Sequence, residues 1–101
     1  MTRESFEPRR QGEAFEFTHG NVPYHVVANR LPDGKLGEVF IDAGKTGSDA
    51  DIVADEAAVL VSLALQYGTP LSTIRAALPK LADGKPAGPM GQALKMAEQG
   101  R

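Results

Sequence analysis

The fold is decided by the stretch SDADIVADEAAVLVSLALQYG at residues 48–68, which predicts one long helix with an unusually wide apolar surface. Ser48 is a good N-cap residue, and Gly68 is a typical C-terminal stop. Asp49 and Asp51 place negative charge in the first turn, where the helix dipole is positive. At about 100° per residue, one narrow polar stripe contains Asp51, Asp55, Ser62 and Gln66. The apolar remainder is wider than one sheet face covers, so we expect the helix to be sandwiched between a sheet and a second layer.

Three strand patterns precede this helix, and short turns separate them. Residues 14–18, 22–29 and 36–43 contain the alternating or continuous apolar residues that are typical of strands. The turns are residues 19–21 and 32–35, where glycine stands beside asparagine or aspartate. Consecutive strands joined by short turns pair antiparallel, so we expect a three-stranded meander.

Two shorter helices follow the long one. Thr69 and Pro70 predict a new start, with Thr69 as N-cap and Pro70 in the first position, and this helix ends near Pro79. Glycine and proline predict a loop over residues 82–89, and helical spacing of apolar residues predicts a last helix over residues 90–99. The expected fold class is therefore α+β: a three-stranded antiparallel β-meander followed by a long buried helix and two shorter helices.

Length and composition indicate one domain. The chain has 101 residues, of which 42% are hydrophobic and 24% are charged, with a net charge of −2. We expect residues 1–12 to form a flexible N-terminal arm and residues 13–99 to form a single domain. No apolar run is long enough for a membrane helix and no signal core begins the chain, so we expect a cytoplasmic protein without membrane contact. The acidic balance argues against nucleic-acid binding, despite three arginines in the arm.

The lack of cysteine removes most catalytic chemistry. The chain contains no cysteine, and therefore no thiolate nucleophile, no dithiol redox pair and no cysteine-type metal site. His19 and His25 lie on different predicted elements, and no carboxylate pattern accompanies them as metal ligands. We therefore predict no catalytic residue, no metal and no cofactor, and we do not expect enzyme activity from the chain on its own.

One glycine-rich connector, GKTGS at residues 44–48, has features of a ligand-binding loop. It resembles the end of a phosphate-binding P-loop, but Val39 stands where that motif needs glycine, and Asp49 and Asp51 repel a phosphate. A structural connector before a capped helix is one interpretation. Binding of a nucleotide or phosphate is the other, because helix N-termini attract anions. The candidate ligand-binding residues are Gly44, Lys45, Gly47 and Ser48.

The chain contains the stretches DGKLGEVFI (residues 33–41), GKTGS (44–48) and SLALQYGTPL (62–71). Together they resemble the TSCPD domain, which occurs near the C-terminus of adenosylcobalamin-dependent (class II) ribonucleotide reductases. A further stretch, GPMGQAL (88–94), is similar to small stand-alone members of this family. The resemblance implies kinship with an accessory part of these enzymes.

The chain lacks residues that are typical of the family, and this limits the functions that the resemblance implies. The large reductases generate a radical at a cysteine, and this chain lacks both cysteine and the Thr-Ser-Cys-Pro-Asp motif that names the domain. The resemblance therefore implies a non-catalytic accessory or interaction module that regulates or supports deoxyribonucleotide synthesis, with a ribonucleotide reductase or another protein as partner. A sensor that binds a small ligand at residues 44–48 is the alternative. We also expect a homodimer, because a second copy can cover the flank of the long helix that the sheet leaves open.

Overall fold

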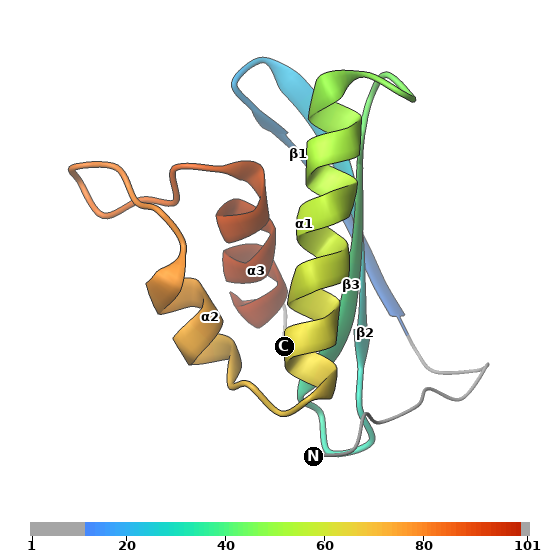
Figure 1. The fold of residues 1–101 in the computed structure, drawn as a ribbon, viewed down its shortest axis with the longest axis vertical. Coiled ribbons are helices and arrows are strands. Elements are labelled where there is room, and N and C mark those ends of the chain that lie inside the picture. Colours follow the sequence, from blue (N-terminus) through green and yellow to red (C-terminus); the bar gives the residue numbers. More distant parts are fainter. Residues whose placement is uncertain (1–11, 100–101) are drawn as a thin grey trace.

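The computed structural model describes residues 12–99, which form a three-stranded antiparallel sheet followed by three helices (Figure 1). The strands lie in the order β1-β2-β3, so each pairs with its neighbour in the chain. This arrangement confirms the expected α+β class. The predicted arm lies outside the described residues except for Gly12, which begins β1. The elements are β1 (Gly12–His19), β2 (Val22–Arg30), β3 (Leu36–Ala43), α1 (Asp49–Gln66), α2 (Leu71–Ala77) and α3 (Pro89–Gln99).

Both strand connections are tight turns that the local residues favour. Gly20 and Asn21 form a two-residue turn with φ of 57° and 65°. Positive φ at both positions matches the twist of the flanking strands in a hairpin. In the second turn Gly34 has a φ of 90°, and the carboxylate of Asp33 accepts a hydrogen bond from the amide of Lys35 at 2.9 Å. These turns therefore set the strand register.

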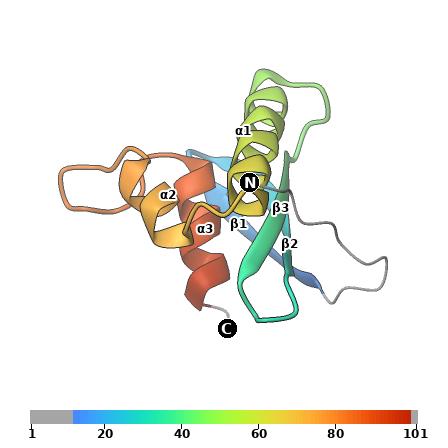
Figure 2. The same cartoon turned by 60° about the horizontal axis from the view of Figure 1, so that its bottom comes forward.

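The helices pack on one face of the sheet. α1 runs along β3, α3 lies beside α1 against β2 and β3, and α2 packs on α3 (Figures 1 and 2). The core lies between these layers, and small buried residues of α1 allow this helix to approach the sheet closely. The buried members are Tyr24, Val26, Ala28, Leu36, Val39, Ile41, Ala43, Ala54, Ala58, Val61, Leu65, Ile74, Met90, Ala93, Leu94 and Ala97.

Two residues of the polar stripe of α1, Ser62 and Asp51, bond to the open edge of β3. Ser62 Oγ accepts a hydrogen bond from the amide of Val39 at 2.9 Å and donates one to its carbonyl at 3.0 Å. Near the end of the strand, Asp51 Oδ1 accepts a hydrogen bond from the amide of Ala43 at 3.0 Å. β3 is an edge strand, and an open edge presents unpaired main-chain groups. Side chains of α1 therefore satisfy groups that a fourth strand could otherwise pair with.

The junction between α1 and α2 corrects one expectation. Gly68 ends α1 as predicted, with a φ of 97°. The amide of Thr69 donates to the carbonyl of Ala64 at 2.9 Å, so Thr69 belongs to the C-terminal cap of α1 and is not the N-cap of α2. α2 begins instead at Leu71, with Pro70 as N-cap and no capping side chain. The chain passes directly from the turn at Gly68 into α2. The amide of Thr69 is used in the main-chain hydrogen bond that ends α1, and the side chain of Thr69 does not cap α2.

One flank of α1 is exposed although it is mainly apolar, with the exposed Glu56 as a charged residue among its members. We call the apolar part of this flank the outer face of α1 and define it as Ile52, Val53, Val59, Leu60 and Tyr67, which are between 45% and 67% exposed. The described parts of α2 and α3 leave most of this face uncovered: only Val53, at its edge, borders the segment that leads from α2 into α3. They therefore do not supply the full second layer that was expected. Within residues 12–99, no helix has both the length and the apolar character needed to cross a membrane.

Candidate functional site

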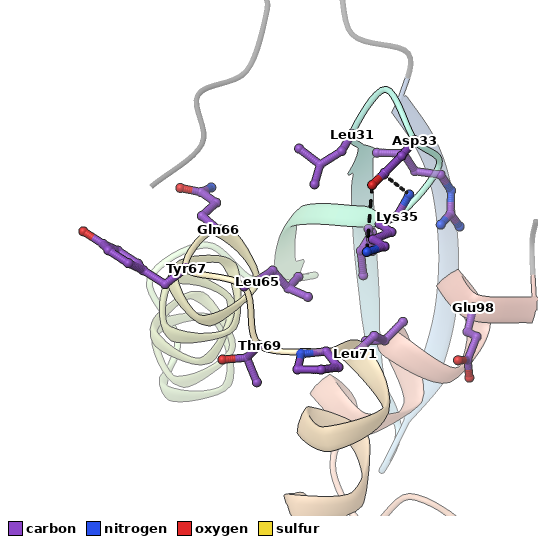
Figure 3. A pocket seen from close by; sticks show the side chains of 13 residues that line it. Leu31, Asp33, Lys35, Leu65, Gln66, Tyr67, Thr69, Leu71 and Glu98 are labelled. Carbon is purple, nitrogen blue, oxygen red and sulfur yellow. Dashed lines mark hydrogen bonds and ion pairs between the residues drawn. The ribbon is translucent and has the colours of Figure 1, made fainter. Parts of the chain in front are cut away.

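A pocket of about 430 Å³ opens beside the C-terminal end of α1 (Figure 3). Its walls come from the β2–β3 turn, the end of α1, the start of α2 and one residue of α3. These segments are far apart in the sequence, and only the fold brings them together. The lining residues include Leu31, Lys35, Leu65, Thr69 and Leu71.

Two glycine turns place the walls of this pocket. The β2–β3 turn is closed by hydrogen bonds between Leu31 and Lys35 at 2.7 Å and between Gly34 and Leu31 at 2.9 Å. On the opposite side, Gly68 lets the chain leave α1 and enter α2 within a few residues. The pocket therefore lies where the first and third stretches that resemble the TSCPD domain meet.

The pocket combines an apolar wall with polar residues. Leucine side chains from the turn, α1 and α2 line it, and so do the polar residues Asp33, Lys35, Thr69 and Glu98 (Figure 3). Lys35 Nζ lies 4.0 Å from the carboxylate of Asp33, and the Lys35 side chain is 79% exposed. An ion pair this long and exposed is weak, so Lys35 can exchange it for an anionic group of a ligand.

Arg30 also borders the pocket, but its guanidinium group is already bound by the protein. It contacts Glu13 Oε1 at 2.7 Å and the carbonyl oxygens of Gly34 at 3.3 Å and Ala97 at 2.5 Å. Its side chain is only 17% exposed. Arg30 therefore ties β1, the β2–β3 turn and the end of α3 together, and it supports the pocket wall.

The two histidines make separate contacts away from one another. His19 Nε2 lies 3.0 Å from the carbonyl oxygen of Ala87, which joins the first hairpin to the loop before α3. His25 Nδ1 lies 3.5 Å from a carboxylate oxygen of Glu16 on the outer side of the sheet. Among residues 12–99, no three His, Asp or Glu side chains gather as a candidate metal site.

The predicted ligand-binding loop lies at the other end of α1 from the pocket (Figure 1). Ser48 caps the helix: its hydroxyl accepts a hydrogen bond from the amide of Asp51 at 3.2 Å and donates one to the carbonyl of Lys45 at 2.7 Å. The amide of Gly44 donates to the carbonyl of Pro23 at 2.8 Å. Several polar groups of this loop are therefore engaged within the protein.

Asp51 occupies further donors of the same loop. Its carboxylate accepts hydrogen bonds from the amides of Gly47 at 2.9 Å and Ala43 at 3.0 Å. These two bonds, with Gly47 contributing most, hold the pKa of Asp51 below its ordinary value of 3.8. A carboxylate of the chain thus sits where an external anion needs donors. Ligand binding by Gly44, Lys45, Gly47 and Ser48 stays a prediction.

Sequence reasoning missed the pocket beside the C-terminal end of α1. It predicted the turn at residues 32–35 and the helix break at Gly68 separately, and both are present. Their contact depends on the direction in which α1 crosses β3, which no local pattern specifies. The useful signal was that two of the three stretches resembling one family contain these turns.

These features define a small α+β domain with a pocket at one end of its long helix and an exposed apolar flank along it. The chain belongs to the TSCPD domain family, whose sequence profile matches residues 3–97. This match confirms the resemblance seen in the three stretches. No solved structure matches the chain significantly.

The relatives that this chain resembles are much longer than the chain itself. Vitamin B12-dependent ribonucleotide reductase of Streptantibioticus cattleyicolor is 42% identical over 64 residues, which cover 63% of this chain and 11% of that protein. The protein of that name from Agrobacterium fabrum is 38% identical over 69 residues, which cover 68% of this chain and 5% of the relative. The one from Rhodopirellula baltica is 33% identical over 72 residues, or 71% and 7% of the two chains. This chain therefore spans only a small part of each relative.

Proposed function

We propose that this chain is a non-catalytic interaction module that supports deoxyribonucleotide synthesis in the cytoplasm by contact with a vitamin B12-dependent ribonucleotide reductase. Membership of the TSCPD domain family supports the link, because the named relatives that share this domain are such reductases. The observation that carries contact as the mode of action is the amount of exposed apolar surface on a small domain. Apart from Leu81, the large exposed hydrophobic residues form two separate areas.

The first area is the outer face of α1, and the second lies on the uncovered side of the sheet. We call the second area the sheet patch and define it as Val27 and Phe40, which are 41% and 53% exposed. The two residues stand directly opposite each other in the β2–β3 register, so their side chains form one surface. Such a pair of exposed apolar side chains can form the centre of a protein contact.

The residues of the chain favour contact over chemistry. The family resemblance implies a cysteine radical in the large reductases, and this chain contains no cysteine. A thiolate nucleophile or a recycling dithiol pair therefore has to come from another protein. A role that needs only a binding surface fits this composition.

Binding to the reductase tests the proposal directly. Purified vitamin B12-dependent reductase from the same cell is passed over the immobilised full chain, and we expect saturable binding. Phe40→Glu should weaken it by about tenfold or more, because a charge at the centre of an apolar contact must lose its water. Leu81→Glu is the matched control, since Leu81 is equally exposed at 53% but lies outside both apolar areas.

Two results contradict the proposal. If the unmodified chain does not bind the reductase at tens of micromolar, the reductase is excluded as its partner. Conversion of a ribonucleotide to its deoxy form by the purified chain alone removes the non-catalytic role. Equal weakening by Phe40→Glu and Leu81→Glu keeps the partner but excludes the sheet patch as the contact.

A small-ligand sensor is the second candidate function, and the pocket beside the end of α1 favours it. The volume of about 430 Å³ is in the range of small-molecule sites, and the leucine wall beside Lys35 and Thr69 suits an apolar body that carries polar groups. ATP, dATP and cobalamin are titrated while the amide signals are followed by NMR. Shifts at Lys35 and Thr69 locate binding in the pocket, shifts at Lys45 and Ser48 locate it in the loop, and no shift at either removes this candidate.

A further inference from the structure

We infer that the outer face of α1 binds a second copy of this chain, with the two α1 helices antiparallel about a twofold axis at Leu60. The inference goes beyond the proposed function, because it assigns one of the two apolar areas to self-association. The sheet patch, on the other side of the sheet, then remains available for a different protein.

The spacing of the exposed residues is that of a helix–helix contact. Val53, Leu60 and Tyr67 follow one another at intervals of seven residues, and so do Ile52 and Val59. Seven residues make about two helical turns, so each set forms a row along the helix, as in paired helices. Leu60 is the most exposed of the five at 67% and lies in the middle of its row.

The row is self-complementary when the helices run in opposite directions. Val53 and Tyr67 are equally far from Leu60 along the chain. A twofold axis at Leu60 therefore places Leu60 against its own copy and Val53 against the partner's Tyr67. Such an isologous contact closes with two chains and leaves no open surface for further copies.

The charges of α1 select the antiparallel arrangement. All of its ionisable side chains are acidic, and they occupy the first eight residues: Asp49, Asp51, Asp55 and Glu56. No charged side chain follows between Ala57 and Gln66. Parallel helices in register bring the acidic halves together, which costs free energy, whereas antiparallel helices place each acidic half beside an uncharged half. The helix dipoles also oppose each other in that arrangement.

An apolar groove beside Val53 provides space for the partner's tyrosine. The groove has a volume of about 330 Å³ and lies between α1 and the segment that leads from α2 into α3. Val53 and Ala57 form its α1 wall, and Leu78, Pro79 and Met90 form the opposite wall. The antiparallel register brings the partner's Tyr67 to the mouth of this groove. Each half of the dimer then supplies one ring and one groove.

Sedimentation equilibrium of the full chain tests the assembly. We expect a mass of twice 10.7 kDa at tens of micromolar and a monomer for Leu60→Glu. Phe40→Glu is the matched control, because it places the same charge on a comparably exposed residue of the other face and should stay dimeric. A monomeric unmodified chain overturns the inference, as does a dimer that Phe40→Glu breaks and Leu60→Glu does not.

Single cysteines test the register without depending on how a charged variant folds. The chain has no cysteine of its own, so an introduced one reports only on its own position. Leu60→Cys should form a disulfide-linked dimer on mild oxidation, a mixture of Val53→Cys and Tyr67→Cys chains should cross-link to each other, and Phe40→Cys should stay monomeric in a denaturing gel. A dimer in solution in which Leu60→Cys does not cross-link overturns the antiparallel register.

The two proposals fail separately. A chain that is monomeric but binds the reductase overturns the dimer and leaves the proposed function, with the outer face of α1 then free for the reductase. A chain that is dimeric but does not bind the reductase overturns the proposed function and leaves the dimer.

Discussion

The hydroxyl of Ser62 holds both main-chain polar groups of Val39, with distances of 2.9 Å to the amide and 3.0 Å to the carbonyl. Val39 itself is 1% exposed, and it lies on the edge strand of the sheet. One side chain on α1 thus fixes the helix to the strand and satisfies two groups that an open edge leaves unpaired.

Removal of this hydroxyl should cost stability. Ser62→Ala leaves the amide and carbonyl of Val39 without their partner in a partly buried place, so we expect a loss of about 1–3 kcal/mol in the free energy of unfolding. Urea unfolding of the full chain measures it. Ser72→Ala is the control, because Ser72 is exposed in α2 and a surface change of this kind stays within about 0.5 kcal/mol. Equal effects of the two changes contradict the assigned role of Ser62.

The carboxylate of Asp51 should make stability depend on pH in the acid range. Hydrogen bonds from Gly47 and Ala43 lower its pKa in the folded chain below 3.8, so the unfolded chain binds the proton more readily. The contribution of Asp51 is therefore fully present above pH 3.8 and is lost as the pH falls through the lower, folded pKa.

Comparison with Asp51→Asn isolates this contribution. We expect the unmodified chain to be more stable than the variant at neutral pH, and the difference to shrink between about pH 5 and about pH 2. Asp55→Asn removes a charge one turn later without touching either hydrogen bond, and serves as the control. A difference between the chain and Asp51→Asn that is independent of pH contradicts the assignment.

A side chain at Gly68, the glycine that ends α1, should lower the stability of the chain. Its φ of 97° lies in the region that L residues avoid, so Gly68→Ala should destabilise the chain by about 1–3 kcal/mol. Gly88→Ala is the matched control, because a methyl group at Gly88 meets nothing within 4 Å and its φ is not positive. Thermal unfolding compares them, and a similar melting temperature for both would falsify the strain assigned to Gly68.

Arg30 should need its planar guanidinium group and not only its charge. Three different guanidinium nitrogens bond to Glu13, Gly34 and Ala97, whereas lysine carries all its donors on one nitrogen. We therefore expect Arg30→Lys to lose about 1.5–3 kcal/mol of stability. Glu13→Gln removes one charged partner and leaves both carbonyl contacts, so its loss should be smaller. Chemical denaturation measures both, and an Arg30→Lys variant as stable as the unmodified chain contradicts the role of Arg30 in joining β1, the turn and α3.

Local patterns predicted the three strands and three helices of residues 12–99, but not all of their ends. The alternation of Phe15 and Phe17 predicted β1, although the strand extends further at both ends because β2 pairs with it along its whole length. The prediction failed at Thr69, because the same residue can cap the helix that follows or close the helix that precedes, and the main-chain bond to Ala64 prevails. The propensities of single residues do not rank such competing contacts.

The order of strands and helices and the width of the apolar surface of α1 were determined by the sequence itself, because hydrogen bonding within elements and side-chain periodicity act over a few residues. Only the tertiary structure decided that the polar stripe of α1 faces the edge of β3, that two distant turns form one pocket, and that α2 and α3 leave the outer face of α1 open. Those outcomes depend on the packing of α1 across the sheet, where contacts such as Ser62 with Val39 join residues far apart in the chain.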